Sequence, residues 1–150
     1  MTDLNDIIAI ADKQDAGAEL VIINPITQEL TDLKFWIAGP DSNVAQDAKN
    51  WAADRARREH VLQLPPAMAN AAEVREITLS IAVGMLARYV VRWDVRQNGE
   101  PVPFTIKNAE RVLASSRIIR DQIDAFAASR DPWIPKKVDP VKREAGDAAA

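Results

Sequence analysis

The sequence predicts a mainly α-helical domain of the α+β class, with a small N-terminal β-hairpin and a compact bundle of about four helices. Two observations lead to this prediction. Apolar residues recur at helical spacing along most of the 150-residue chain, whereas the segment from Glu19 to Ile37 carries β-branched and aromatic residues around an Asn-Pro turn. We expect an N-terminal helix or flexible arm (1–17), a hairpin-plus-helix domain (18–130) and a disordered tail (131–150).

The N-terminal part of the chain predicts one helix and two strands. Apolar residues at positions 4, 7, 8 and 11 share one helical face, which predicts a short helix from Leu4 to Ala11. The run Glu19–Ile23 is rich in β-branched residues, and Leu33–Ile37 follows it after a loop with the sequence NPITQELTD. We expect these two runs to pair as an antiparallel hairpin.

Two longer helices follow the hairpin. Gly39–Ser42 ends the second strand and offers side-chain oxygens for an N-cap, and small apolar residues then recur at helical spacing to about Glu59. Trp51 is the one large anchor of this stripe, so we expect it to pack in the core against a neighbouring helix. The second long helix is predicted to start at Asn70, with Glu73 completing a variant of the capping box.

The second long helix is predicted to be the centre of the core. No charged residue occurs from Ile77 to Ala87, and apolar side chains form two stripes that extend to Val90, so we expect other helices on all sides. Gly84 in its middle costs about 1 kcal/mol relative to alanine, which indicates the close approach of another backbone.

The segment from Trp93 to Glu110, WDVRQNGEPVPFTIKNAE, predicts a tight turn followed by a helix. Asn98 and Gly99 tolerate positive φ, and the two prolines that follow hold the chain extended. We expect Trp93 to pin this loop and Thr105 to cap a helix. After a Ser-Ser interruption, a last helix completes the bundle. The apolar residues that these two helices present are Ala109, Val112, Leu113, Ile119, Ile123, Phe126 and Ala127.

The tail from Asp131 contains three prolines and mixed charge, which predicts a mostly disordered segment. Only Trp133 and Ile134 can anchor it. Large amphipathic rings occur both in cores and at binding hot spots. We place Trp36 in the core, and we interpret Trp133 as a partner contact, with docking onto its own domain as the alternative.

The sequence offers little support for catalysis or cofactor binding. It contains no cysteine, and its single histidine, His60, has no second histidine with which to form a metal site. We interpret His60 as a solvated or helix-terminal residue. The pairs Asp121/Asp124 and Asp12/Asp15 are interpreted as exposed charged faces rather than cation sites. With no glycine-rich phosphate loop and no serine in the context of an activated nucleophile, we expect no enzyme, no cofactor and no small-molecule substrate.

The charge balance favours protein partners. The formal net charge is −3, whereas a duplex-DNA footprint needs clustered, uncompensated lysine and arginine. The run from Arg55 to Arg58 is the best nucleic-acid candidate, but Asp47, Asp54 and Glu59 neutralise much of that face. We interpret it as a solvated helix surface, with docking of an acidic partner next and nucleic acid last. The candidate partner-binding residues are Trp133, Arg55, Arg58 and Trp51.

The sequence also predicts a cytoplasmic protein without a membrane segment. No apolar run approaches the roughly 20 residues that a bilayer-spanning helix needs, and the start of the chain is acidic rather than basic. The lack of cysteine fits a reducing compartment.

The segment from Trp93 to Glu110 resembles the C-terminal half of the tail assembly chaperones of long-tailed bacteriophages, in which a similar order of aromatic, glycine, proline and threonine residues precedes a short helix. The pattern LVIINPITQELTDLKFWIAGPDS resembles the start of the same chaperones and of related minor tail proteins. The two matches cover most of residues 18 to 126. The dipeptide Arg96-Gln97 departs from the more acidic or glycine-containing approach to the turn that the family shows, and residues before 18 have no clear counterpart.

The resemblance implies a non-enzymatic assembly factor in the host cytoplasm that binds the tape measure protein, keeps it soluble, helps bring tail tube subunits to it and is absent from the mature virion. A long amphipathic helix exposes an apolar stripe that a groove on a small helical domain can cover. We expect that groove between the first two long helices and the C-terminal pair. Self-association stays open.

Two alternatives from other classes stay open beside this one. A structural virion component, such as a tail completion or head-tail connector protein, would share the compact fold but remain in purified particles. A helical nucleic-acid-binding domain would use the arginines at 55–58 and would bind in a strongly salt-dependent way.

Overall fold

The computed structural model describes residues 2–59 and 71–135. Within them the helices are α1 (Leu4–Asp15), α2 (Asn43–Arg58), α3 (Ala71–Tyr89), α4 (Ile106–Ser115), α5 (Arg117–Ala127) and the short 3-10 helix η1 (Asp131–Trp133). The strands are β1 (Ala18–Ile23), β2 (Leu30–Ile37), β3 (Val90–Asp94), β4 (Arg96–Gln97) and β5 (Glu100–Pro101). The predicted α+β class, mainly helical with a small antiparallel sheet, is confirmed.

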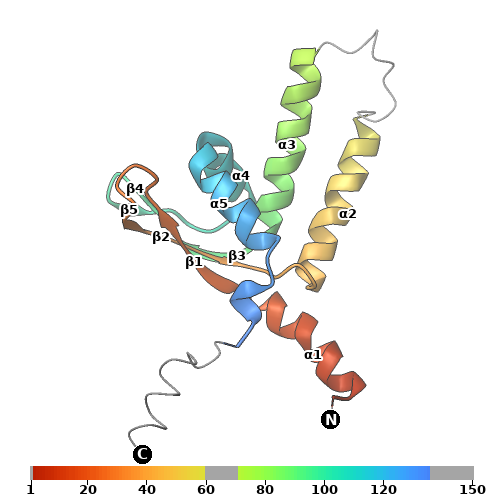
Figure 1. Cartoon of the computed structure of the whole chain (residues 1–150). Helices are drawn as coiled ribbons and strands as arrows, with labels where there is room; N and C mark the ends of the chain where they lie inside the picture. Colours follow the sequence, from red (N-terminus) through yellow and green to blue (C-terminus); the bar gives the residue numbers. More distant parts are fainter. Residues whose placement is uncertain (1, 60–70, 136–150) are drawn as a thin grey trace, which may run out of the picture.

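The core lies between the sheet and the helices. Strands β1, β2 and β3 form an antiparallel sheet in that order, and β4 and β5 form a separate hairpin. Helices α4 and α5 lie over one face of the larger sheet, while α2 and α3 stand side by side and project beyond it (Figure 1). The side chains of Phe35, Ile37, Leu113 and Ile123 meet in this core and are 0% exposed.

The predicted hairpin is confirmed, but the sheet has a third strand that the sequence analysis missed. The helical pattern predicts that Val90 belongs to the long helix, whereas α3 ends at Tyr89 and the next five residues form β3, which pairs with β2. Val90 and the residues after it continue the apolar pattern of the helix without a break, so periodicity alone does not mark the change. The helix-to-strand junction is closed by the amide of Ala38, which donates to the carbonyl of Tyr89 at 2.9 Å.

Trp93 joins the sheet to the segment that leads into α4, as expected of a residue that pins this loop. Its Nε1 donates to the carbonyl of Val102 at 2.8 Å. Its ring packs edge-on against Phe35 and Phe104, with ring centroids 5.9 and 5.2 Å apart. Trp36, by contrast, does not belong to the buried cluster: strand alternation turns it to the opposite face, where the Arg92 guanidinium lies 4.2 Å from its ring centroid.

The turn and capping residues are confirmed. Asn98 and Gly99 have φ values of 54° and 77°, the pair of positive angles that a type I′ hairpin turn requires. Ser42, Thr105 and Ser116 are the N-caps of α2, α4 and α5, and each hydroxyl accepts a backbone N–H of the first turn. These contacts satisfy amides that helix geometry leaves without partners. The caps at Ser42 and Thr105 are the predicted ones, whereas Ser116 was expected only to interrupt the helices and proves to be a cap as well.

Helix α3 is buried at one end only, so the prediction of helices on all sides is wrong. Val83 and Leu86 are 4% exposed and join the core, whereas Leu79 is 44% exposed. The N-terminal half of α3 extends beyond α4 and α5 (Figure 1). An uncharged helical run therefore did not indicate burial along its whole length. The predicted start at Asn70 lies outside the described residues, as does His60.

The first helix and the ordered part of the C-terminal segment are both longer than predicted. Helix α1 is confirmed and continues past Ala11 to Asp15. The expected disorder from Asp131 is wrong for the first residues, because Asp131–Trp133 forms η1 and its last residue donates to the carbonyl of Arg130 at 2.9 Å. Residues 136–150 lie outside the described part. Across the helices of the two described ranges, none combines the length and apolar character needed to span a bilayer.

An aromatic ring, and not a second backbone as expected, lies against Gly84 and leaves no room for a side chain there. Trp51 of α2 lies directly over Gly84, so a Cβ at this position would overlap the indole ring. The guanidinium of Arg88 stacks 3.6 Å from the centroid of the same ring and donates to the carbonyl of Gly84 at 2.8 Å. Trp51 thus fills the space between α2 and α3.

We predict that Gly84→Ala destabilises the protein by about 1–3 kcal/mol, the usual cost of overpacking, although alanine is the better helix former by about 1 kcal/mol. Urea denaturation of both proteins measures the difference. The same substitution in a Trp51→Leu background serves as control, because there the ring is gone and the alanine is expected to be neutral or stabilising. Equal effects in the two backgrounds would refute the role assigned to Trp51.

Candidate protein-binding surfaces

The structure groups three of the four candidate partner residues and separates the fourth. Trp51, Arg55 and Arg58 lie along α2 toward its C-terminal end. Trp133 lies half-buried in η1, which follows α5 and sits near α1, at the other end of the molecule (Figure 1). The four residues therefore do not form one site.

Two members of the α2 group have structural partners. Arg55 donates from Nη2 to the Ser80 hydroxyl at 3.4 Å and lies 3.4 Å from the Glu59 carboxylate, and its guanidinium is 5.8 Å from the centroid of the Trp51 ring. Arg88, which also contacts that ring, is 3.6 Å from Glu110 of α4. Trp51 and Arg55 thus join α2 to α3, and Arg88 joins α3 to α4.

Arg58 borders an open hollow of about 460 Å³ that is also lined by Trp51, Asp54 and Arg57. Arg57 is ion-paired with Asp54. The predicted neutralisation of this basic run is therefore confirmed for Arg55 and Arg57. An arginine that already has a carboxylate partner attracts phosphate less strongly.

A hollow also lies where the sequence analysis expected a groove, between the first two long helices and the C-terminal pair. It has a volume of about 250 Å³, and its walls come from α2, α3 and the end of α5. Met85 and Ala127 supply apolar surface, and Lys49 and Asp124 supply opposite charges. Burial, together with the Asp124 carboxylate, raises the pKa of the Tyr89 hydroxyl, which also lines the hollow.

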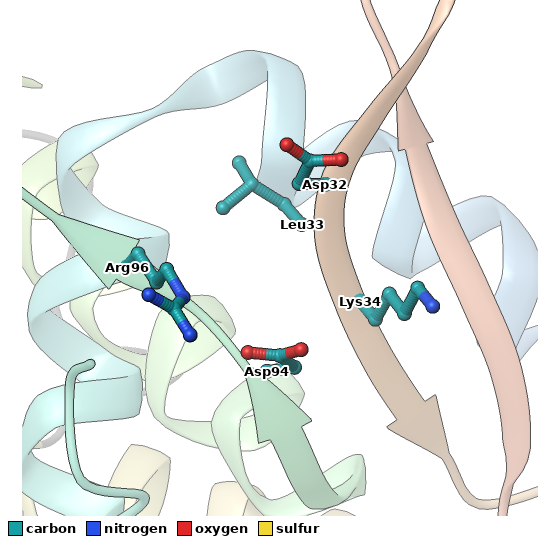
Figure 2. A pocket seen from close by; sticks show the side chains of 5 residues that line it. All are labelled: Asp32, Leu33, Lys34, Asp94 and Arg96. Carbon is teal, nitrogen blue, oxygen red and sulfur yellow. The ribbon is translucent and has the colours of Figure 1, made fainter. Parts of the chain in front are cut away.

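A hollow of about 570 Å³ lies beside the first half of β2 and the end of β3, and the charges of its lining side chains balance. It is lined by Leu33 and by two acids and two bases: Asp32, Lys34, Asp94 and Arg96. Figure 2 shows Arg96 reaching toward Asp94 while Lys34 points away from both. Lys34 is 3.8 Å from the Glu19 carboxylate on the neighbouring strand. The balanced charges give this hollow no clear preference for a charged ligand. Within the described ranges, no three histidine or acidic side chains are placed to hold a metal ion together.

A polar network that the sequence analysis missed fixes the corner between β2 and α2. Gln14 is 2% exposed. Its side-chain oxygen accepts from the Asp41 backbone N–H at 2.7 Å, and its side-chain nitrogen donates to the Asp41 carboxylate at 3.0 Å. Its backbone carbonyl accepts from the amide of Gly39 at 3.1 Å. Arg130, just after α5, makes two hydrogen bonds of 2.8 and 2.7 Å to the same carboxylate. The corner, α1 and the end of α5 are therefore tied together.

Asp15 adds a second attachment between α1 and α2, so its interpretation as part of an exposed face is wrong. Its carboxylate accepts from the Val44 amide at 2.9 Å and from the Asn43 side chain at 3.0 Å. A carboxylate is favourable at a helix N-terminus because the free amides and the helix dipole are positive there. Asp12 is exposed, as expected, and Asp121 pairs with Arg117 on the surface.

Attachment by its last turn leaves the first two turns of α1 uncovered. Leu4 is 72% exposed, Ile7 56% and Ile8 55%. These residues share with Ala11 the apolar face that the sequence predicted. An apolar groove of about 380 Å³ lies elsewhere, between the β1–β2 turn and the start of α5, and includes Ile26, which is 88% exposed. Exposed apolar patches of this kind are typical of protein-binding surfaces.

No protein-family model, curated protein or solved structure matches the chain.

The Asp41–Arg130 pair gives a testable pH dependence. The hydrogen bonds from Arg130, and then those from Gln14, lower the pKa of Asp41 from 3.8 to about 2. Because the folded-state pKa is the lower one, the stabilisation is fully present above about pH 4 and is lost as the pH falls from 3.8 toward 2. We expect an NMR titration of Asp41 to give this low pKa, and Arg130→Gln to raise it toward 3.8.

Arg117→Gln is the matched control, because Arg117 is an exposed arginine that pairs with Asp121 instead. It should leave the pKa of Asp41 unchanged. An unaltered Asp41 pKa in Arg130→Gln would contradict the assignment of Arg130 as the main cause.

Proposed function

We propose that this protein is a tail assembly chaperone of a long-tailed bacteriophage, which binds the tape measure protein, keeps it soluble and helps to recruit tail tube subunits. The proposal rests on the resemblance of residues 18 to 126 to that family. It describes a binding protein rather than an enzyme, acting in the host cytoplasm.

The observation that carries the proposal is that the two segments of the resemblance form one structural unit. Strand β2 of the first segment pairs with β3, and Phe35 lies opposite Trp93 in the register. Trp93 in turn holds the second segment through Val102. The residues that this chain shares with the family pattern thus form turns, helix caps and aromatic contacts of this fold. A pattern of that kind supports a common architecture, and a chaperone role follows by analogy.

The hollow between α2, α3 and α5 is the surface that we assign to the tape measure helix. Met85 and Ala127 can receive an apolar side chain from an amphipathic helix, and Lys49 and Asp124 can pair with charges that flank its apolar stripe. The hollow is open, and a shallow apolar site rimmed by charge suits binding that must later be reversed as the tail is built.

Co-expression with the tape measure protein of the same phage tests this function. We expect the chaperone to raise the soluble fraction of the tape measure protein and to co-purify with it. Failure on both counts would refute the proposal. Detection of the chain in purified virions by mass spectrometry would instead favour a tail completion or connector protein.

Filling the hollow tests the assigned surface. Ala128 is exposed and lines the hollow, so Ala128→Trp should block it and weaken binding of the tape measure protein by roughly tenfold, or about 1.4 kcal/mol. Ala125→Trp is the control, because Ala125 is exposed in the last turn of α5, just before Ala128, but is not part of the lining. Pull-down with quantified complex gives the comparison, and equal binding by the two variants would show that the hollow is the wrong surface.

A further inference from the structure

The exposed aliphatic side chains are concentrated at two places. Of the eleven large hydrophobic residues that are exposed in the described chain, eight belong to α1 or to the region where the β1–β2 turn meets the start of α5. Single exposed apolar residues are normal on protein surfaces, whereas grouped ones indicate binding. Each place contains one apolar surface, and we call these two surfaces the α1 stripe and the hairpin groove. The α1 stripe consists of Leu4, Ile7, Ile8 and Ala11, and the hairpin groove is lined chiefly by Ile22, Ile23, Pro25, Ile26, Ile118 and Ile119.

The α1 stripe has the form of a helical ligand. Its residues follow the spacing i, i+3, i+4 and i+7, by which an amphipathic helix enters an apolar groove. A capping box orders its first turn: the Asp3 carboxylate accepts from the Asn5 amide at 2.7 Å, and the Asp6 carboxylate accepts from the Asp3 amide at 2.9 Å. A helix that is already formed loses little conformational entropy when it binds.

The hairpin groove is also preformed. The Gln122 side chain accepts from the amide of Ile23 at 2.9 Å and donates to its carbonyl at 2.8 Å, which holds α5 against the edge of β1. The Asn24 side chain accepts from the Ile26 amide at 2.9 Å and shapes the turn. Because Gln122 already uses the backbone of Ile23, the groove offers apolar side chains rather than a strand edge at this point.

The α1 stripe cannot reach the hairpin groove of its own chain. Only Ala16 and Gly17 separate α1 from β1, so α1 lies at the start of β1 whereas the groove lies at its end. Six strand residues span roughly 20 Å. Gln14 and Asp15 fix the last turn of α1, and the helix points away from the β1–β2 turn (Figure 1).

Charge favours the groove over a second α1 as the docking site. Asp3, Asp6 and Asp12 accompany the α1 stripe, so two such helices side by side would bring like charges together. The first turn of α5 contains no acidic residue. Arg117 in that turn pairs with Asp121 at 3.4 Å, but an exposed pair of this kind is weak and the Arg117 side chain is 84% exposed, so it can still attract an acidic helix. The positive end of the α5 helix dipole adds to this attraction for an acidic helix.

We propose that the α1 stripe of one copy of this protein docks in the hairpin groove of a second copy, so that copies associate head to tail. The contact is heterologous, and repetition of it gives a closed ring or an open row, depending on the rotation between neighbours. The proposal does not depend on the identity of the tape measure protein or on the hollow assigned to it.

Two variants of the full-length protein test the proposal. Ile7→Gln/Ile8→Gln removes the stripe, and Ile26→Gln/Ile118→Gln removes the groove. All four residues are at least 49% exposed, and glutamine keeps the helix propensity of α1, so both variants should fold. Sedimentation velocity over a range of concentrations measures association, and circular dichroism checks the fold.

The expected result is that the wild-type protein associates more as its concentration rises, whereas each variant alone stays a monomer. An equimolar mixture of the two variants should form a heterodimer, because it retains one intact stripe and one intact groove. Leu79→Gln is the control, since Leu79 is 44% exposed on α3 and belongs to neither surface, and it should associate like the wild type.

Three outcomes would overturn the proposal. A wild-type protein that stays monomeric at all concentrations would exclude self-docking and leave both surfaces to a foreign partner. Self-association by the groove variant alone would indicate pairing of α1 with α1. A mixture that remains monomeric although the wild type associates would mean that the stripe and the groove do not bind each other.

Discussion

The burial of β2 is the constraint on which the rest of the structure depends. It is the central strand of the sheet, and its Phe35 and Ile37 are fully buried in the hydrophobic core. Because strand side chains alternate between faces, that burial also decides what lies outside, including Trp36 under Arg92. Pairing of β2 with β3 sets the position of Trp93. The indole N–H of Trp93 donates to the carbonyl of Val102 and so holds the segment that leads into α4. A slip of one residue in β2 would expose the core face, so its register is strongly specified.

The polar contacts at the corner between β2 and α2 explain why the apolar face of α1 is exposed. Gln14 and Asp15 satisfy the backbone amides of the β2–α2 corner, and Arg130 joins the end of α5 to the same carboxylate of Asp41. A buried amide left without a partner would cost about 1–3 kcal/mol, so these contacts fix the last turn of α1 firmly. The helix is then held at one end, and its apolar face continues past the edge of the domain. Exposure of Ile7 and Ile8 is therefore a consequence of how α1 is attached and does not reflect a loose chain end.

The sequence predicted the features that depend on neighbouring residues. The caps at Ser42 and Thr105 and the Asn98–Gly99 turn need only local geometry, so their residue types identify them. Features that depend on distant contacts could not be read in the same way. Val90 and Trp93 of the third strand continue the apolar spacing of α3, so the spacing does not mark where the helix ends. Gln14 and Arg130 meet only because α1 and the end of α5 converge on Asp41. A buried glutamine looks like any surface glutamine in the sequence, so no signal distinguished the corner from an exposed helix end.

The candidate surfaces are separate, so they could be occupied at the same time. The hollow beside Met85 and Ala127 shares no lining residue with the α1 stripe or the hairpin groove, so occupation of one does not by itself remove another. If copies associate head to tail, the hollows repeat at a fixed interval along the row. A long helix that enters several of them gains effective concentration at each further site, and individually weak contacts then hold it firmly. The same row releases the helix when the contacts between copies are broken, because every remaining site is again weak. Reversible self-association would in this way give a small domain both tight coverage of a long helix and a route to its removal.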